Sequence, residues 1–163
     1  MKNWYKPLKK FLLAVIIVLV AMIIYLCGIV FTEQNYEWFL ALNKPTFQPA
    51  SWVFMLVWAI LFIFIAASAI IVLFGPKKSL KKCEFTIILF VFNAIFNAIF
   101  NLVFFGFHSI VGALIILPFF LASVFLLIWC VYNTNKIAAY LLVPYALWAI
   151  YATILMVNVF FIN

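Results

Sequence analysis

Five long apolar segments, none of which contains Asp, Glu, Lys or Arg, limit what this chain can fold into. About 20 mainly apolar residues suffice for a helix to cross a bilayer, and inside lipid every backbone N–H and C=O must be bonded within the structure. Barrel strands would alternate polar and apolar residues over about ten positions, which these segments do not do. The sequence therefore predicts an all-α membrane protein, a five-transmembrane-helix bundle that forms a single domain over residues 1–163. The predicted spans are 11–31, 52–74, 85–105, 110–132 and 137–162.

The overall composition excludes a soluble fold. Hydrophobic residues make up 72% of the chain and charged residues 8%, against roughly 45–50% and about 25% in soluble domains. The net charge of +7 comes from ten Lys, eight of which lie in two clusters, within 2–10 and 77–82. Lysines beside apolar segments face anionic headgroups, whereas a nucleic-acid interface needs charge spread over a folded polar surface. We therefore expect the lipid bilayer as a partner, and no nucleic acid.

The lysine distribution predicts how the helices are oriented. From the N-terminus, the tail and the four successive connections carry four, one, four, no and one Lys. Positively charged connections remain on the cytoplasmic side. The N-terminus is therefore predicted to be cytoplasmic and the C-terminus to lie outside, in a multi-pass protein of a bacterial plasma membrane. The first apolar segment is too long for the core of a signal peptide and is expected to remain as a helix.

Three asparagines, Asn93, Asn97 and Asn101, recur every fourth residue in the third segment. On a helix this spacing places them along one slowly drifting face. Because an unpaired amide in hydrocarbon is costly, that face must point into the bundle. Two interpretations stay open: the amides join helices, each bond contributing about 0.6 kcal/mol, or they anchor a ligand in a cavity.

Two tryptophans, Trp58 and Trp148, lie well inside apolar segments, away from the membrane interfaces where Trp is usually enriched. They either pack the core or form the aromatic wall of a pocket for a flat apolar ligand. Pro118 and Pro144 also fall within segments, where each removes a backbone hydrogen bond and favours a kink.

Groups for catalysis or metal binding are scarce. The three Glu lie outside the apolar segments, the single His, His108, falls in the short connection 106–109, and the three Cys are far apart. No carboxylate pair, nucleophile–base set or metal-ligand spacing is visible. The sequence therefore predicts no catalytic residues, no metal site and no cofactor, and it favours a protein that is not an enzyme.

The connection after the first apolar segment carries the most specific pattern in the chain. WFLALNKP at 38–45 is followed by Pro49, by WVF at 52–54 and by VW at 57–58. This stretch resembles the signature of the TspO/MBR family, the tryptophan-rich sensory proteins related to the mitochondrial translocator protein. Further matches follow in the family's order: Asn97, Phe104-Phe105-Gly106, Pro144-Tyr145, Trp148, Ala152, Leu155 and Asn163. Departures from the family pattern are Ala50, Phe100 and Met156, where Pro, Trp and Asn are usual.

The resemblance implies a membrane receptor, sensor or carrier with an aromatic pocket near the outer side, capped by the connection 32–51. Family members bind porphyrins such as protoporphyrin IX, some bind sterols, and many are dimers. The implied partners are thus a porphyrin or another apolar, sterol-like molecule and a second copy of the chain. Lys44 would either pair with a ligand carboxylate or order the connection itself. By matching position, the ligand-binding residues would be Trp38, Phe39, Phe54, Trp58, Asn97, Phe100, Phe104, Trp148 and Ala152.

Two other functions stay open at this point. Some family members are reported to degrade porphyrin in light, which would make this chain an enzyme whose chemistry comes from the excited ligand and nearby indoles. The helices could instead dock a protein partner without any small ligand. The lack of an acid–base set favours a binding protein over an enzyme.

Overall fold

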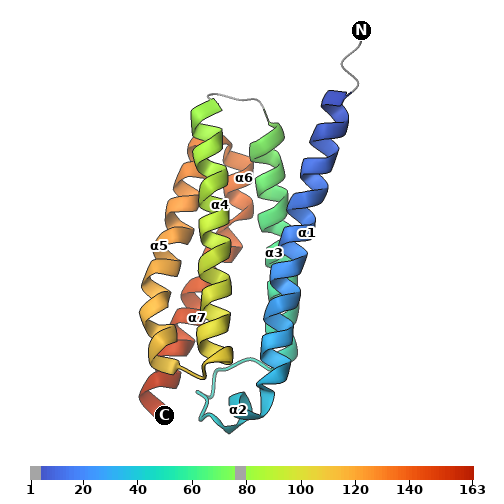
Figure 1. Ribbon diagram of the computed structural model, residues 1–163. Helices are drawn as coiled ribbons and strands as arrows, with labels where there is room; N and C mark the ends of the chain where they lie inside the picture. The colour runs from blue at the N-terminus through green and yellow to red at the C-terminus, as the bar shows by residue number, and fades with distance from the viewer. Residues whose placement is uncertain (1–4, 76–79) are drawn as a thin grey trace.

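The computed structural model describes residues 5–75 and 80–163, which form an elongated bundle of helices (Figure 1). No strand occurs in these two ranges. The helices are α1 (Tyr5–Gln34), α2 (Tyr36–Ala41), α3 (Ser51–Phe74), α4 (Leu80–Asn101), α5 (Ile110–Thr134), α6 (Lys136–Leu141) and α7 (Val143–Ile162), with a π-helical turn, Leu102–Gly106, directly after α4.

Within the described residues, five helical spans are long and apolar enough to cross a membrane, which confirms the predicted five-helix fold and a multi-pass membrane protein. The helices extend beyond the apolar runs. α1 continues to Gln34 and α5 to Thr134, because a helix need not stop where it leaves the hydrocarbon. The connection predicted over 32–51 is not all loop, since it contains the end of α1 and the short helix α2.

The fifth apolar segment is divided into two helices. α6 ends at Leu141 and α7 begins at Val143, so that Pro144 stands in the first turn of α7. A proline in a helix interior would leave the carbonyl four residues earlier without its N–H partner, but the first turn of a helix tolerates it. This local break is the structural counterpart of the kink expected at Pro144.

The core runs along α5, which packs against α4 and α7. Its buried side chains recur every three or four positions: Ala113, Leu117, Phe120, Val124, Leu127 and Val131. Side chains on outward faces are also apolar, such as Phe119 and Leu147, which are 59% and 64% exposed. Large apolar surfaces of this kind are unfavourable in water, so they must face the bilayer.

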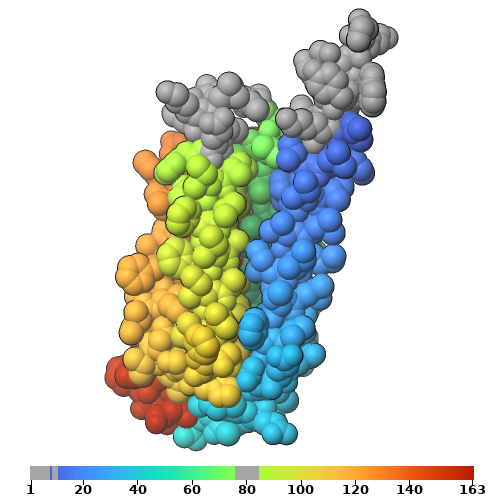
Figure 2. All heavy atoms as spheres, viewed as in Figure 1, coloured from blue at the N-terminus to red at the C-terminus, as the bar shows by residue number. Residues whose placement is uncertain are grey.

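α1 lies at the edge of the bundle and packs against α3 and α4. No residue in its most apolar 18-residue window is buried. Figure 2 shows α1 (blue) and α4 (yellow-green) side by side along one face of the molecule, with the segment 35–50, here called the cap, closing the lower end. The cap contains α2.

α1 begins at one end of the bundle and α7 finishes at the other, beside the cap (Figure 1). This arrangement places the cap and the end of α7 on the same side of the membrane. Which side is cytoplasmic remains the prediction made from the lysines. Of those lysines, Lys2, Lys77 and Lys78 lie outside the described residues.

Candidate ligand-binding site

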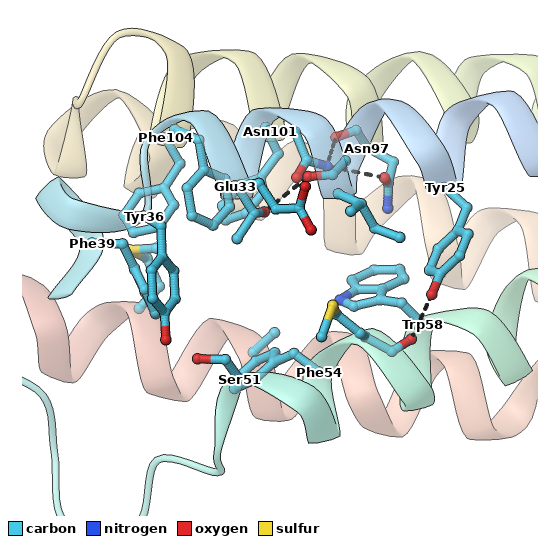
Figure 3. Close-up of a pocket in the computed structure, with 18 of the residues that line it drawn as sticks. Tyr25, Glu33, Tyr36, Phe39, Ser51, Phe54, Trp58, Asn97, Asn101 and Phe104 are labelled. Atoms are coloured by element: carbon cyan, nitrogen blue, oxygen red, sulfur yellow. Dashed lines mark hydrogen bonds between the residues drawn. The ribbon is translucent and has the colours of Figure 1, made fainter.

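A cavity of ≈ 480 Å³ lies between α1, α3, α4 and α7, next to the cap. Its size falls within the range of roughly 300–1,000 Å³ found for small-molecule sites. Figure 3 shows its lining side chains arranged around an open centre. The cavity occupies the half of the bundle toward which α1 ends and α3 begins, and it is therefore close to one membrane surface.

Aromatic rings form much of the cavity wall. Phe54 and Trp58 project from α3, while Phe100 and Phe104 come from the end of α4 and its π-helical turn. The Phe100 and Phe104 rings lie 5.9 Å apart at 17°, nearly parallel. Phe39 of α2 meets Phe104 edge-on at 6.4 Å and closes the wall at the cap. Such surfaces favour a flat apolar ligand that can stack against rings.

The π-helical turn decides where two of these rings point. Phe104 is only 4% exposed, and its ring meets that of Phe105 at 4.8 Å, so both residues of the pair pack inward. In a π-helix each turn holds an additional residue, which shifts side chains relative to a regular α-helix. π-Helical turns occur frequently at functional sites, and here the turn delivers both rings to the cavity lining.

The asparagine row is divided between interhelical hydrogen bonding and the cavity wall. Asn93 is buried and joins three helices: its Nδ2 donates to Ser123 Oγ at 2.8 Å, and its Oδ1 accepts from Tyr145 Oη at 2.8 Å. Asn97 and Asn101 instead line the cavity. Asn101 Nδ2 donates to the Asn97 carbonyl at 2.9 Å, which fixes the orientation of its amide. Along this face of α4, Asn93 therefore bonds to neighbouring helices, and Asn97 and Asn101 form a polar part of the cavity wall.

Seven of the nine residues expected to bind ligand line this one cavity: Phe39, Phe54, Trp58, Asn97, Phe100, Phe104 and Ala152. They come from α2, α3, α4, the π-helical turn and α7, so segments up to about a hundred residues apart in the chain are brought together. Their role in binding remains a prediction, but their common location is a feature of the fold.

The other two expected residues, Trp38 and Trp148, stand behind the lining. Trp38 packs edge-on against Phe104 at 5.2 Å. Trp148 packs edge-on against Phe54 at 5.4 Å, and its buried Nε1 has no hydrogen-bond partner among the residues that the structure describes. Both indoles therefore support rings that reach the cavity rather than lining it themselves.

Sequence reasoning missed the contribution of α1. Tyr25, Gly28, Thr32 and Glu33 of α1 line the cavity, as does Tyr36 at the start of α2. α1 is apolar on all sides, so its sequence carries no periodic signal for an inward face. The one available signal was the cluster of polar residues in its last turn, where a membrane helix meets the interface.

The cap is held at two places. Asn163 forms a reciprocal pair with the backbone of Asn43, since its Oδ1 accepts from Asn43 N at 2.9 Å and its Nδ2 donates to Asn43 O at 3.0 Å. Tyr151 Oη donates to Phe47 O at 3.0 Å. Lys44 Nζ donates to Leu40 O at 3.0 Å, and Lys44 does not line the cavity. This hydrogen bond orders the connection, which is one of the roles expected for Lys44.

A third contact ties α2 to the turn before α5. His108 Nε2 lies 2.7 Å from Asn35 Oδ1, and the His108 ring stacks on Trp38 at 4.5 Å and 16°. His108 adopts the left-handed conformation, with φ at 53°. That conformation is unusual for a residue with a Cβ, and the surrounding contacts must maintain it. The connection 106–109 therefore positions Trp38, and through it Phe104.

Replacing Asn163 with Ala should loosen the cap without unfolding the bundle. Both hydrogen bonds to Asn43 are lost, each with a net contribution of about 0.5–1.5 kcal/mol, while the helices keep their contacts. We expect faster hydrogen exchange at the backbone amides of 42–48. Asn133→Ala is a matched control, because among the described residues its Nδ2 donates only to the carbonyl of Trp129 in its own helix. Unchanged exchange in the Asn163 variant would show that other contacts hold the cap.

The chemical groups of the cavity lining are mainly of the kind that bind a ligand through ring faces and hydrogen bonds. The lining offers ring faces, amides, hydroxyls and one carboxylate, that of Glu33. In the portion of the chain that is described, no group of three or more His, Cys, Asp or Glu side chains comes together. The arrangement can enclose a flat apolar molecule and hydrogen-bond to its edge.

Comparison with known proteins shows which family the chain resembles. The model of the TspO/MBR family matches residues 12–162. A protein of Bacillus cereus named Tryptophan-rich protein TspO is 30% identical over 85% of this chain and 88% of its own length. The Tryptophan-rich sensory protein of Cereibacter sphaeroides is 29% identical over 72% of this chain and 71% of its own. Protein CrtK of Rhodobacter capsulatus is 26% identical over 77% and 78%.

Proposed function

Because this chain belongs to the TspO/MBR family, we propose that it is a membrane sensor or carrier that binds a porphyrin, such as protoporphyrin IX, in the cavity between α1, α3, α4 and α7. The observation that carries the proposal is the aromatic cavity of ≈ 480 Å³, lined by seven of the nine residues named from the family resemblance. A sensory role is further supported by the name of the relative from Cereibacter sphaeroides, a Tryptophan-rich sensory protein.

Stacking supplies the main attraction in this proposal. A porphyrin is a flat apolar disc, and Trp58 and Phe54 on α3 face the stacked pair Phe100 and Phe104 across the cavity. Offset-stacked and edge-on ring pairs add roughly 0.5–1.5 kcal/mol each beyond the burial of apolar area. The amides of Asn97 and Asn101 would bond to polar atoms of the ligand, fixing its orientation.

Titration of the purified protein with protoporphyrin IX in lipid nanodiscs tests this function. The Soret band should shift saturably at micromolar porphyrin or below. Trp58→Ala removes an indole from the wall and should weaken binding about tenfold, equivalent to about 1.4 kcal/mol. The matched control is Trp129→Ala, whose indole is 65% exposed on the outside of α5 and should not matter.

Two results would contradict the proposal. If the porphyrin signal shows no saturable component beyond the partitioning seen with empty nanodiscs, the protein does not bind porphyrin and the proposal is wrong. Equal weakening by Trp58→Ala and Trp129→Ala would place the porphyrin on the outer surface instead of in the cavity. Illumination of the same samples also tests porphyrin degradation, since an enzyme would bleach the Soret band faster than free porphyrin in lipid.

A further inference from the structure

The cavity contains an acidic side chain at its edge. Glu33 lies in the last turn of α1 and lines the cavity, and its side chain is exposed. Figure 3 shows its carboxylate directed toward the open centre, with the hydroxyl groups of Tyr36 and Ser51 on the other side of the cavity. Among the residues described here, no hydrogen bond or ion pair engages this carboxylate, and a bound molecule can therefore reach it directly.

No cationic side chain of the lining offsets this charge. The lining residues include no Lys, Arg or His, and Glu33 is the one acidic residue among them. The nearest candidate in the cap, Lys44, is used elsewhere: its Nζ donates to Leu40 O and lies 4.7 Å from the centre of the Phe39 ring. The edge of the cavity therefore has a net negative charge beside aromatic walls.

We propose that Glu33 makes this cavity selective for the charge of its ligand, favouring a flat molecule whose edge carries neutral or cationic groups over one whose edge carries carboxylates. This inference rests on the proposed function and specifies which members of the ligand class bind best. A cationic group beside Glu33 gains a charge-assisted contact. A ligand carboxylate at that position meets a like charge, which disfavours its binding.

Three forms of one macrocycle test the charge effect apart from the stacking. The forms are protoporphyrin IX with two carboxylates, its neutral dimethyl ester, and a diamide whose short arms end in amines. Each is titrated in nanodiscs of zwitterionic lipid, with the partitioning into empty nanodiscs subtracted. We expect the dissociation constant to rise from the cationic to the neutral to the dianionic form, by about fivefold at each step, as for a partly exposed ion pair of about 1 kcal/mol.

The variant Glu33→Gln should remove this order and leave the neutral ester unchanged. The dianionic form should then bind about fivefold more tightly, and the cationic form about fivefold more weakly. Glu37→Gln is the matched control, because Glu37 lies four residues away, in α2, and does not line the cavity. It should preserve the order found in the wild type.

The outcomes separate this inference from the proposed function. Saturable binding of all three forms without a charge order, or an equal change for all three in Glu33→Gln, would overturn the role of Glu33 and leave porphyrin binding intact. If no macrocycle binds, the proposed function fails, and planar tricyclic dyes of positive, zero and negative charge replace the porphyrins in the same assay. A charge order that depends on Glu33 among the dyes would support the inference alone, and its absence there would overturn both.

Discussion

Replacing Ala152 with Phe should lower the affinity for protoporphyrin IX by at least about 30-fold, equivalent to about 2 kcal/mol. Ala152 lies on α7 and lines the cavity. A phenyl group at this position would extend into the volume that the ligand needs. Extra side-chain volume in a filled core strains the fold by typically 1–3 kcal/mol, but here the added ring would enter the cavity and not a close-packed core. The thermal unfolding midpoint should therefore change little while binding is lost.

Ile154→Phe is the matched control for this steric test. Ile154 is on the same helix two residues later, and its side chain is 50% exposed on the outer surface. The same phenyl group there faces lipid and should leave the dissociation constant unchanged. Wild-type affinity in the Ala152 variant, measured by the Soret titration, would mean that the ligand binds elsewhere. A large drop in its unfolding midpoint would mean that the cavity closes in the unliganded protein.

Replacing Asn93 with Ala should destabilise the bundle by about 1–3 kcal/mol, the cost of leaving a buried hydrogen-bonding group without its partner. Asn93 is 4% exposed and connects α4 to Ser123 of α5 and to Tyr145 of α7. Tyr145 is itself 1% exposed, so its hydroxyl cannot turn to water when Asn93 is removed. Unfolding in mixed micelles of dodecyl maltoside and SDS measures this loss.

A double-mutant cycle isolates the Asn93–Tyr145 bond. If the two side chains act through their shared 2.8 Å hydrogen bond, Asn93→Ala and Tyr145→Phe together should cost less than the sum of the two single changes, by about 0.6–1.7 kcal/mol. Asn158→Ala is the control, since its Nδ2 bonds to Ile154 O within its own helix and joins no second helix. Additive effects within error would show that the two residues stabilise the bundle independently.

The asparagine face of α4 has two ends that should respond differently to substitution. Asn93 is placed where its amide joins α4 to α5 and α7, and removing it should act on stability. Asn97 and Asn101, one and two turns later, line the cavity, and the corresponding changes there should act on binding. Residues of α1, Gly28 and Thr32 among them, line the cavity together with Asn97 and Asn101, whereas Asn93 is absent from the lining.

The number and type of the membrane-spanning elements could be predicted from sequence because each apolar segment must bond its backbone internally in lipid, and only a helix does so within one segment. The WFLALNKP stretch at 38–45 and the later motifs likewise pointed to the family and to nine candidate residues, seven of which line the cavity. Which end of the bundle faces the cytoplasm stays a prediction from the lysine distribution.

The sequence alone determined that this chain is a five-helix membrane protein with aromatic and amide groups inside its bundle. Only the tertiary structure decided which groups meet at the cavity. In water, an inward face is marked by apolar residues among polar ones, but lipid and protein interior are equally apolar, so α1 shows no such mark and its cavity-facing side could not be foreseen. The placement of Trp38 behind the lining likewise depends on the turn at His108, and that of Trp148 on Phe54 of α3, contacts between residues far apart in the chain.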